Sequence, residues 1–179
     1  VGIANVDRYR DFSFPSRDSV DVASLPTSGG GEAFLNFLEN ELQPFIEKRF
    51  HTKGPKTIIG QSMGGLIATE ILMKRPQLFD DYIIVSPSLW WDQQSLVKTA
   101  NDYFKKQRDL EKRVFVSLGK EHPVMHQVAD MLVDAIKNSD NEKMTVFYEP
   151  ILEEDHATIL HMAVYKAFRI LNQKSDKKH

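Results

Sequence analysis

The sequence motif G-x-S-x-G occupies Gly60–Gly64 and carries the clearest sign of chemistry in the chain. An apolar run, Thr57–Ile59, precedes it, and apolar residues at helical spacing follow from Leu66. A serine in that context lies on a sharp strand-to-helix turn, with its hydroxyl above the carboxyl edge of a sheet. Because the turn leaves little room for side chains two residues to either side, both of those positions are glycine. Ser62 is therefore predicted to be a nucleophile, and the Met63 N–H to stabilise an oxyanion.

A serine nucleophile needs a base, and the best candidate among the histidines is His156. The chain offers six histidines: His51, His122, His126, His156, His161 and His179. His156 follows the last β-rich run and precedes the last helical pattern, which places it on a loop at the same sheet edge as Ser62. His161 falls one turn into that helix, so it is expected to lie on the helix surface or in packing.

The third member of a triad would be a carboxylate on another loop at this edge. Glu121 follows a β-rich run that ends at Leu118 and is the first choice. Asp92 follows the preceding run after a longer loop and is the second. Such a carboxylate would orient the imidazole and stabilise its charged form. A serine–histidine pair acting without an acid also stays open.

Other residues at this edge could bind a substrate. The adjacent indoles of Trp90 and Trp91 would wall a pocket, although either one could instead pack over the sheet. Arg8 and Arg10 lie in a charged cluster that could bind an anionic group or form a salt-bridged turn.

Metal and cofactor chemistry has little support in the residue pattern. His122 and His126 are four apart, but Pro123 interrupts the helix between them, so no metal site is predicted there. We expect no cofactor.

The segments that would hold these residues alternate between short apolar runs, typical of buried strands, and apolar residues at helical spacing. Short apolar runs predict buried parallel strands, at 57–59, 82–85, 114–116 and 145–148. Helical spacing follows each run, at 66–74, 96–104, 124–136 and 160–171. Gly65 is expected to let the first of these helices pack closely on its strand. The alternation predicts an α/β domain with helices flanking the sheet.

The first fifty residues follow a different pattern. The start of the chain, 1–3, is interpreted as the end of a strand, and 7–26 as a loop. Apolar residues from Phe34 to Ile46 predict a helix that starts near Gly31, which Pro44 should kink or restart.

Composition limits the class of protein. The chain has 179 residues, 41% hydrophobic and 27% charged, which is ordinary for a globular domain. We predict one domain over 1–173 and a polar tail at 174–179. A net charge of −2 gives no support to nucleic-acid binding, and the absence of cysteine excludes a thiolate nucleophile and a disulfide framework. No apolar run is long enough to predict a membrane span. The compartment stays open between cytoplasm and periplasm.

Several stretches together resemble the Putative esterase family of α/β-hydrolases, and within it the siderophore (enterochelin) esterase-like serine hydrolases. The carrying stretches are 1–5 with 7–11, 59–66, 86–91 and 154–157. The resemblance implies a three-layer α/β-hydrolase sandwich with a mostly parallel sheet. It also implies hydrolysis of a carboxylic ester, of siderophore type, with Ser62 attacking and His156 as base. Arg8 and Arg10 resemble a family position near the mouth of the site.

The resemblance also implies that this chain departs from the family. Members carry roughly another hundred residues before the point where this chain starts, within the usual size of such domains. Those residues would hold the first strands and the loop that supplies the second oxyanion N–H. Their absence would leave the strand at 57–59 with an open edge, and the hypotheses that account for it are a homodimer or other association through that edge, or proteolytic trimming. The alternatives to an esterase are an acyltransferase of the same fold and a catalytically impaired binding or assembly module.

Overall fold

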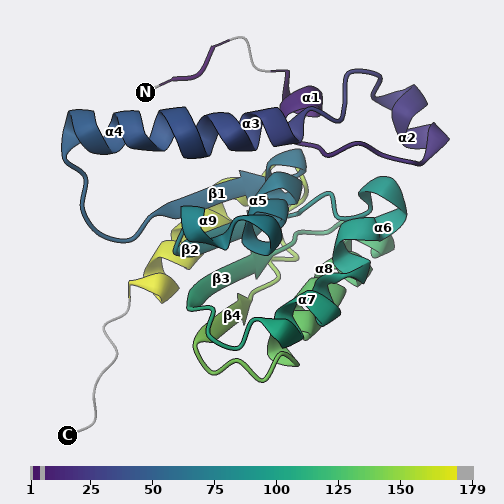
Figure 1. The fold of residues 1–179 in the computed structure, drawn as a ribbon. Helices are drawn as coiled ribbons and strands as arrows, with labels where there is room; N and C mark the ends of the chain where they lie inside the picture. The colour runs from purple at the N-terminus through teal and green to yellow at the C-terminus, as the bar shows by residue number, and fades with distance from the viewer. Residues whose placement is uncertain (1, 5–6, 173–179) are drawn as a thin grey trace, which may run out of the picture.

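The centre of the molecule is a parallel four-stranded sheet (Figure 1). A computed structural model describes residues 2–4 and 7–172. The strands are β1 (Thr57–Gln61), β2 (Asp81–Val85), β3 (Lys112–Ser117) and β4 (Met144–Tyr148), and they pair in chain order. All four expected strands are present, each longer than its apolar run by one to three residues. Because the strands are parallel, their carboxyl ends lie at one edge of the sheet.

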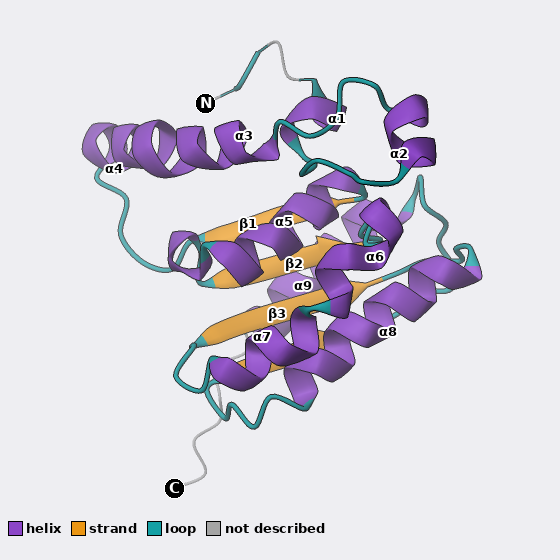
Figure 2. Ribbon diagram, turned by 45° about the vertical axis from the view of Figure 1, so that its right-hand side comes forward, coloured by secondary structure: helices purple, strands orange, loops and turns teal. Residues whose placement is uncertain are grey.

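Helices cover both faces of the sheet, as the alternation predicted (Figure 2). The helices that connect the strands are α5 (Met63–Lys74), α6 (Trp91–Lys98), α7 (Ala100–Lys106) and α8 (Pro123–Lys137). They share one face, since right-handed crossovers between neighbouring strands in chain order all fall on the same side. The last helix, α9 (Ile159–Leu171), packs against β2 and β3 on the other face.

The core has two parts because side chains alternate across the strands. Ile83, Val85 and Phe115 face α9, whereas Tyr82, Ile84 and Val116 belong to the larger cluster on the opposite face. Every residue of β2 is buried. This burial on both faces explains why the strands appear in the sequence as continuous apolar runs.

The polar stretch at 7–26 contains two short helices, where the sequence predicted a loop. They are α1 (Arg8–Asp11) and α2 (Ser19–Ser24). Asp7 and Asp18 each accept hydrogen bonds from the first-turn N–H groups, and this capping stabilises helices that have few apolar anchors. Residues 2–4 lie outside any strand, so the strand expected at 1–3 is wrong for its described part. The predicted tail lies outside the described residues.

The helix that begins at Gly31 is confirmed, and a new helical segment begins next to Pro44, as expected of a restart. Segments α3 (Gly31–Phe37), η1 (Leu38–Leu42) and α4 (Gln43–Phe50) follow one another without a gap. The π turn η1 immediately precedes α4, and Pro44 occupies its first turn, where a missing N–H costs little. Leu35 and Leu38 anchor the long helix in the core beside α5.

The helix predicted at 96–104 is divided between α6 and α7. The division falls at Thr99, whose hydroxyl donates to the Leu96 carbonyl. At the start of α6, Asp92, Gln93 and Gln94 have positive φ angles of 50°, 53° and 67°. A left-handed turn of three successive non-glycine residues is uncommon and cannot be predicted from apolar spacing.

Strand β1 has a neighbour, β2, on one side only within the part of the chain that the structure describes. Ile59, in its centre, is 44% exposed. Among the described residues, the outer edge of β1 is therefore unpaired backbone with one large exposed apolar side chain on the strand. None of the described helices is both long and apolar enough to cross a bilayer.

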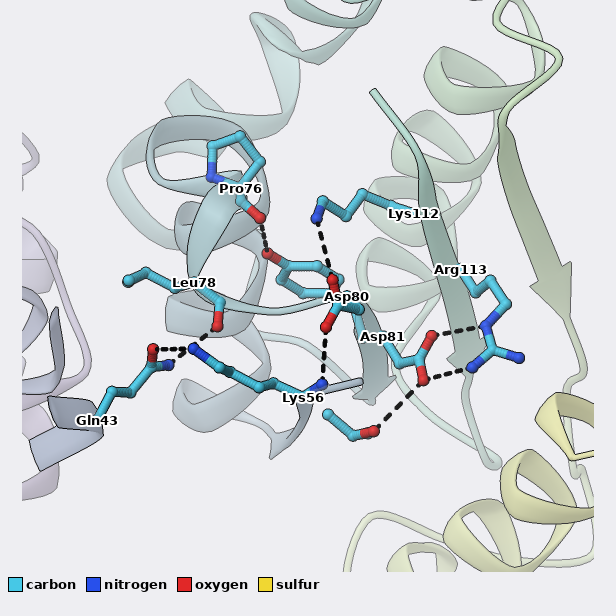
Figure 3. Close-up of polar contacts among 10 residues, drawn as sticks. Gln43, Lys56, Pro76, Leu78, Asp80, Asp81, Lys112 and Arg113 are labelled. Carbon is cyan, nitrogen blue, oxygen red and sulfur yellow. Dashed lines mark hydrogen bonds and ion pairs between the residues drawn. The ribbon is translucent and has the colours of Figure 1, made fainter. Parts of the chain in front are cut away.

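Ion pairs fasten the amino edge of the sheet, opposite the edge that carries Ser62 (Figure 3). Arg113 donates to the Asp81 carboxylate from Nε over 2.7 Å and from Nη2 over 2.6 Å. The third nitrogen of the guanidinium, Nη1, donates to the Leu171 carbonyl at the end of α9. The hydrogen bond to the Asp81 carboxylate raises the pKa of Arg113 above its ordinary value. The Lys56 N–H donates to Asp80. The bonds of Arg113 tie α9 to β2 and β3. Asp80, Asp81 and Arg113 border a depression of about 600 Å³.

Candidate active site

Ser62 lies at the turn between β1 and α5 in a backbone conformation that side chains rarely adopt. Its φ is 58° and its ψ is −119°. Strain of this kind concentrates at functional sites. A Cβ atom on Gly60 would lie 2.0 Å from the Gly64 carbonyl oxygen, so the turn requires glycine at position 60. A Cβ on Gly64 would meet nothing within 4 Å. The steric requirement predicted for both glycines is thus confirmed at Gly60 and wrong at Gly64.

The helix start behind Ser62 is arranged as the motif predicted. Met63 is the first residue of α5, where a backbone N–H has no partner within the helix. That N–H and the positive end of the helix dipole lie next to Ser62. Gly65 permits close packing, as expected, and its nearest neighbour is Pro87 in the turn after β2. A Cβ on Gly65 would lie 2.9 Å from the Pro87 Cα.

Glu121 and His156 meet at the same edge of the sheet. The His156 Nδ1 lies 3.0 Å from Glu121 Oε2 and 3.1 Å from Oε1. The glutamate side chain is 6% exposed, whereas that of the histidine is 47% exposed. An almost buried carboxylate therefore orients an imidazole that stays open to solvent on its other side. With the Nδ1 proton donated to Glu121, Nε2 is left as the proton acceptor.

The backbone holds these two loops together. The Lys120 N–H donates to the Glu154 carbonyl over 2.6 Å, and Lys120 forms a bridge with Asp155. A Cβ atom on Gly119 would lie 2.5 Å from the Glu154 carbonyl oxygen, so the approach depends on glycine at that position. The backbone bond between Lys120 and Glu154 thus positions both Glu121, the next residue after Lys120, and His156, two residues after Glu154.

The histidine loop, residues 149–158, also reaches the nucleophile strand. The Gln61 side-chain amide donates to the His156 carbonyl over 2.5 Å, across the ends of β2 and β3. Ser62 Oγ lies 3.3 Å from the Ser88 hydroxyl. Between the described side chains of Ser62 and His156 there is no direct hydrogen bond. Catalytic serine–histidine bonds are often long or misaligned without a substrate.

Asp92, the alternative candidate for the acid, contacts Ser16, Arg17 and Asp21. Its carboxylate accepts the Arg17 N–H over 2.6 Å and the Ser16 hydroxyl over 3.3 Å, and its own N–H donates to Asp21. Burial tends to raise the pKa of Asp92, but hydrogen bonds from Ser95, Arg17 and Ser16 hold it below its ordinary value. These contacts fasten the left-handed turn to α2 and to the residues before it. The carboxylate that contacts His156 is that of Glu121.

The two tryptophans have different environments. Trp91 is 0% exposed and donates from Nε1 to the Phe14 carbonyl over 2.9 Å. It belongs to the core, which corrects the expectation that both indoles line a pocket. Trp90 is partly exposed and packs edge-on against Trp91 with ring centroids 6.1 Å apart. Trp90 remains the candidate for substrate contact.

The early charged cluster forms a capped turn. Arg10 donates to Asp11 from two nitrogens, at 2.7 and 3.0 Å, and Asp7 caps α1. Arg8 is exposed. Helix α1 contacts α5, the helix that begins next to Ser62. The salt-bridged turn is therefore the interpretation that the contacts favour, and substrate binding by the two arginines stays a prediction.

The other pair of histidines, His122 and His126, occupies different positions at the start of α8. His122 caps α8 through its Nδ1, which accepts the Val124 N–H, and Pro123 is the first residue of that helix. His126 lies on the helix itself. Across 2–4 and 7–172, no group of three or more metal-ligating side chains comes together.

The sequence did not point to Ser88 or Gln61, although both contact the predicted site. Ser88 belongs to the same short stretch as the tryptophans, and Gln61 is the residue before the nucleophile. The sequence could have indicated these two residues only through their positions next to the motif residues. The contacts themselves join loops that follow different strands, so they required the folded chain.

The parallel sheet, its flanking helices and the elbow serine define an α/β-hydrolase-like fold. An IroE-like serine hydrolase from Shewanella oneidensis has this fold, with a TM-score of 0.82 and 24% identity over 93% of this chain and 57% of that one. The BES protein from Bacillus cereus superposes with a TM-score of 0.80 and 29% identity, over 91% of this chain and 62% of that one.

The chain belongs to the family described as Putative esterase, whose model matches residues 3–157. Ferri-bacillibactin esterase from Bacillus subtilis is 28% identical over 176 residues, which are 90% of this chain and 60% of that protein. Siderophore triacetylfusarinine C esterase from Aspergillus fumigatus is 35% identical over 113 residues, 59% of this chain and 38% of that protein. The chain thus spans 60% or less of the length of these two curated relatives.

Proposed function

We propose that the protein hydrolyses a carboxylic ester with Ser62 as nucleophile, His156 as base and Glu121 as the acid that orients the base. The observation that carries the proposal is the contact of both Glu121 oxygens with His156 Nδ1, at the edge where Ser62 occupies its strained turn. Family membership supports ester hydrolysis independently. Along the chain, the proposed nucleophile follows β1, the acid follows β3 and the base follows β4. Nucleophile, acid and base in that order along the sequence are typical of this fold.

The proposed reaction runs through an acyl-enzyme. Ser62 loses its proton to His156 Nε2 as Oγ bonds to the ester carbonyl carbon, and Glu121 stabilises the imidazolium. The Met63 N–H donates to the carbonyl oxygen as that oxygen becomes negative. His156 then returns the proton to the leaving alcohol, which departs. Water, deprotonated in turn by His156, releases the acid and restores the Ser62 hydroxyl.

We propose an ester of the siderophore type as the substrate. Two relatives from different kingdoms carry siderophore esterase names, and together their matches reach most of this chain. The partly exposed indole of Trp90, beside the turn that carries Ser88, is placed to pack against a flat aromatic or acyl group.

The test is covalent labelling combined with turnover. The purified protein is expected to hydrolyse p-nitrophenyl acetate and to gain one phosphonyl group from a fluorophosphonate, located at Ser62 by peptide mass spectrometry. Ser62→Ala is the control and should abolish both signals. Hydrolysis of ferri-bacillibactin or triacetylfusarinine C, followed by chromatography, tests the substrate class. Wild-type protein that stays unlabelled, or acyl transfer to an added alcohol in place of hydrolysis, would contradict the proposal.

We further propose that the open edge of β1 mediates association, because unpaired strand edges beside exposed apolar side chains tend to pair. Sedimentation of the protein at increasing concentration is expected to show a dimer. Ile59→Lys places a charge on that edge and should shift the population toward monomer. A monomer at all concentrations would rule the association out.

A further inference from the structure

The turn after β2, residues Ser86–Ser88, is held rigidly against the nucleophile turn. The Ser86 N–H donates to the Ser117 carbonyl over 2.8 Å, and the Ser88 N–H donates to the Ser62 carbonyl over 3.0 Å. Pro87 lies so close to Gly65 that a Cβ on the glycine would clash with it. Contacts from the nucleophile turn, β3 and α5 therefore fix the position of the turn.

The Ser88 hydroxyl is directed at the reacting atom of the proposed mechanism. Ser88 is 3% exposed, and its Oγ lies 3.3 Å from Ser62 Oγ. Among the side-chain hydrogen bonds of the described residues, this is the only one that the Ser88 hydroxyl makes. A hydroxyl with little access to water places its proton on the acceptor it has. Either hydroxyl could donate across this contact; when Ser88 is the donor, the proton of Ser62 is left for His156.

We propose that Ser88 is a further catalytic residue, whose hydroxyl donates to Ser62 Oγ and stabilises the negative charge that develops there as His156 removes the proton. The inference rests on the proposed function of Ser62. In that step the Ser62 O–H bond breaks, its proton passes to His156 Nε2, and an Oγ–carbon bond forms to the ester. Ser88 keeps its own proton throughout.

The contribution belongs to the chemical step. Hydrogen bonds to charged groups are about twice as strong as those between neutral groups, so the bond from Ser88 strengthens as Ser62 Oγ gains charge. Once Oγ has become an ester oxygen, it accepts weakly and the bond adds little. Loss of the donor should therefore slow acylation of Ser62 by roughly tenfold while leaving substrate binding almost unchanged.

The turn itself provides a matched control. Ser86 is also a fully buried serine, and its hydroxyl oxygen has no hydrogen-bond partner among the residues that the structure describes. Ser86→Ala therefore removes a buried hydroxyl from the same turn without removing a bond to Ser62. Ser88→Ala removes the bond. Ser88→Cys keeps a side chain of similar size with a weaker donor, and it serves if the alanine variant does not fold.

The experiment measures the second-order rate of fluorophosphonate labelling at Ser62, together with kcat and KM for p-nitrophenyl acetate, from pH 6 to 9. We expect Ser88→Ala to lower the labelling rate and kcat by about tenfold at every pH with KM nearly constant, Ser88→Cys to be intermediate, and Ser86→Ala to match wild type. Equal rates for Ser88→Ala and wild type, or equal losses in Ser88→Ala and Ser86→Ala, would overturn the inference alone. Wild-type protein that fails to label at Ser62 would overturn the proposed function and this inference with it.

Discussion

Replacing His156 with glutamine should lower kcat for p-nitrophenyl ester hydrolysis by about 10²- to 10⁴-fold, the usual contribution of a positioned general base. Glutamine has a similar reach but cannot take the proton from Ser62. The histidine side chain is half exposed, and its hydrogen bond is to Glu121. The fold should therefore survive the change, and the circular dichroism spectrum should match that of wild type.

A second histidine on the same segment gives the control. His161 is exposed in the first turn of α9, five residues further along. His161→Gln should leave kcat within about twofold of wild type, since small surface changes away from a site have small effects. Equal losses in the two variants would contradict the assignment of His156 as the base.

The acid is tested in the same assay. Glu121→Gln places an amide against His156 Nδ1, which favours the wrong tautomer, and the loss in kcat should approach that of the histidine variant. Asp92→Asn should change kcat little and lower the free energy of unfolding, because Asp92 fastens a loop. The reverse pattern would make Asp92 the acid.

Gly60→Ala should destabilise the protein by about 3 kcal/mol and remove most of its esterase activity. The added methyl would lie 2.0 Å from the Gly64 carbonyl oxygen and 2.4 Å from the Gly64 carbonyl carbon. Those atoms are backbone at the start of α5 and have no rotamer that relieves the clash. The helix start must move, and Ser62 moves with it.

Gly64→Ala is the matched variant, because the second motif glycine has open space around its Cβ position. Alanine is the better helix former, so the free energy of unfolding should stay constant or rise by up to about 1 kcal/mol. Urea unfolding followed by fluorescence measures both changes. Equal destabilisation in the two variants would show that the clash at position 60 does not decide the stability of the turn.

The sequence predicts the sheet well for a physical reason. A strand that is buried on both faces is apolar at nearly every position. The residues of β2 and β3 are buried along most of each strand, so both strands appear in the sequence as apolar runs. The prediction fails where short-range polar bonds decide the structure. Helices α1 and α2 depend on aspartate caps, and the left-handed turn at 92–94 depends on partners far away in the chain.

The site was predictable to the same extent as the strands that carry it. Ser62, His156 and Glu121 could be selected because each follows a strand at one edge, and the structure brings Glu121 and His156 into contact. Trp91 was misjudged because an indole at a strand end can turn inward as easily as outward. Ser88 was missed because its position opposite Ser62 results from the pairing of β1 with β2.

The histidine loop has a further consequence for how activity would be lost. Beyond Ile151, whose N–H donates to the Leu118 carbonyl, its backbone is bonded to other segments at two points, by the bond from Lys120 to the Glu154 carbonyl and by the bond from Gln61 to the His156 carbonyl. Neither point belongs to the hydrophobic core. A partly open state in which this loop detaches would separate base from nucleophile while the sheet stays folded. Heat or urea would then remove the proposed esterase activity before the sheet unfolds, and exchange of the Lys120 amide proton would follow the same opening.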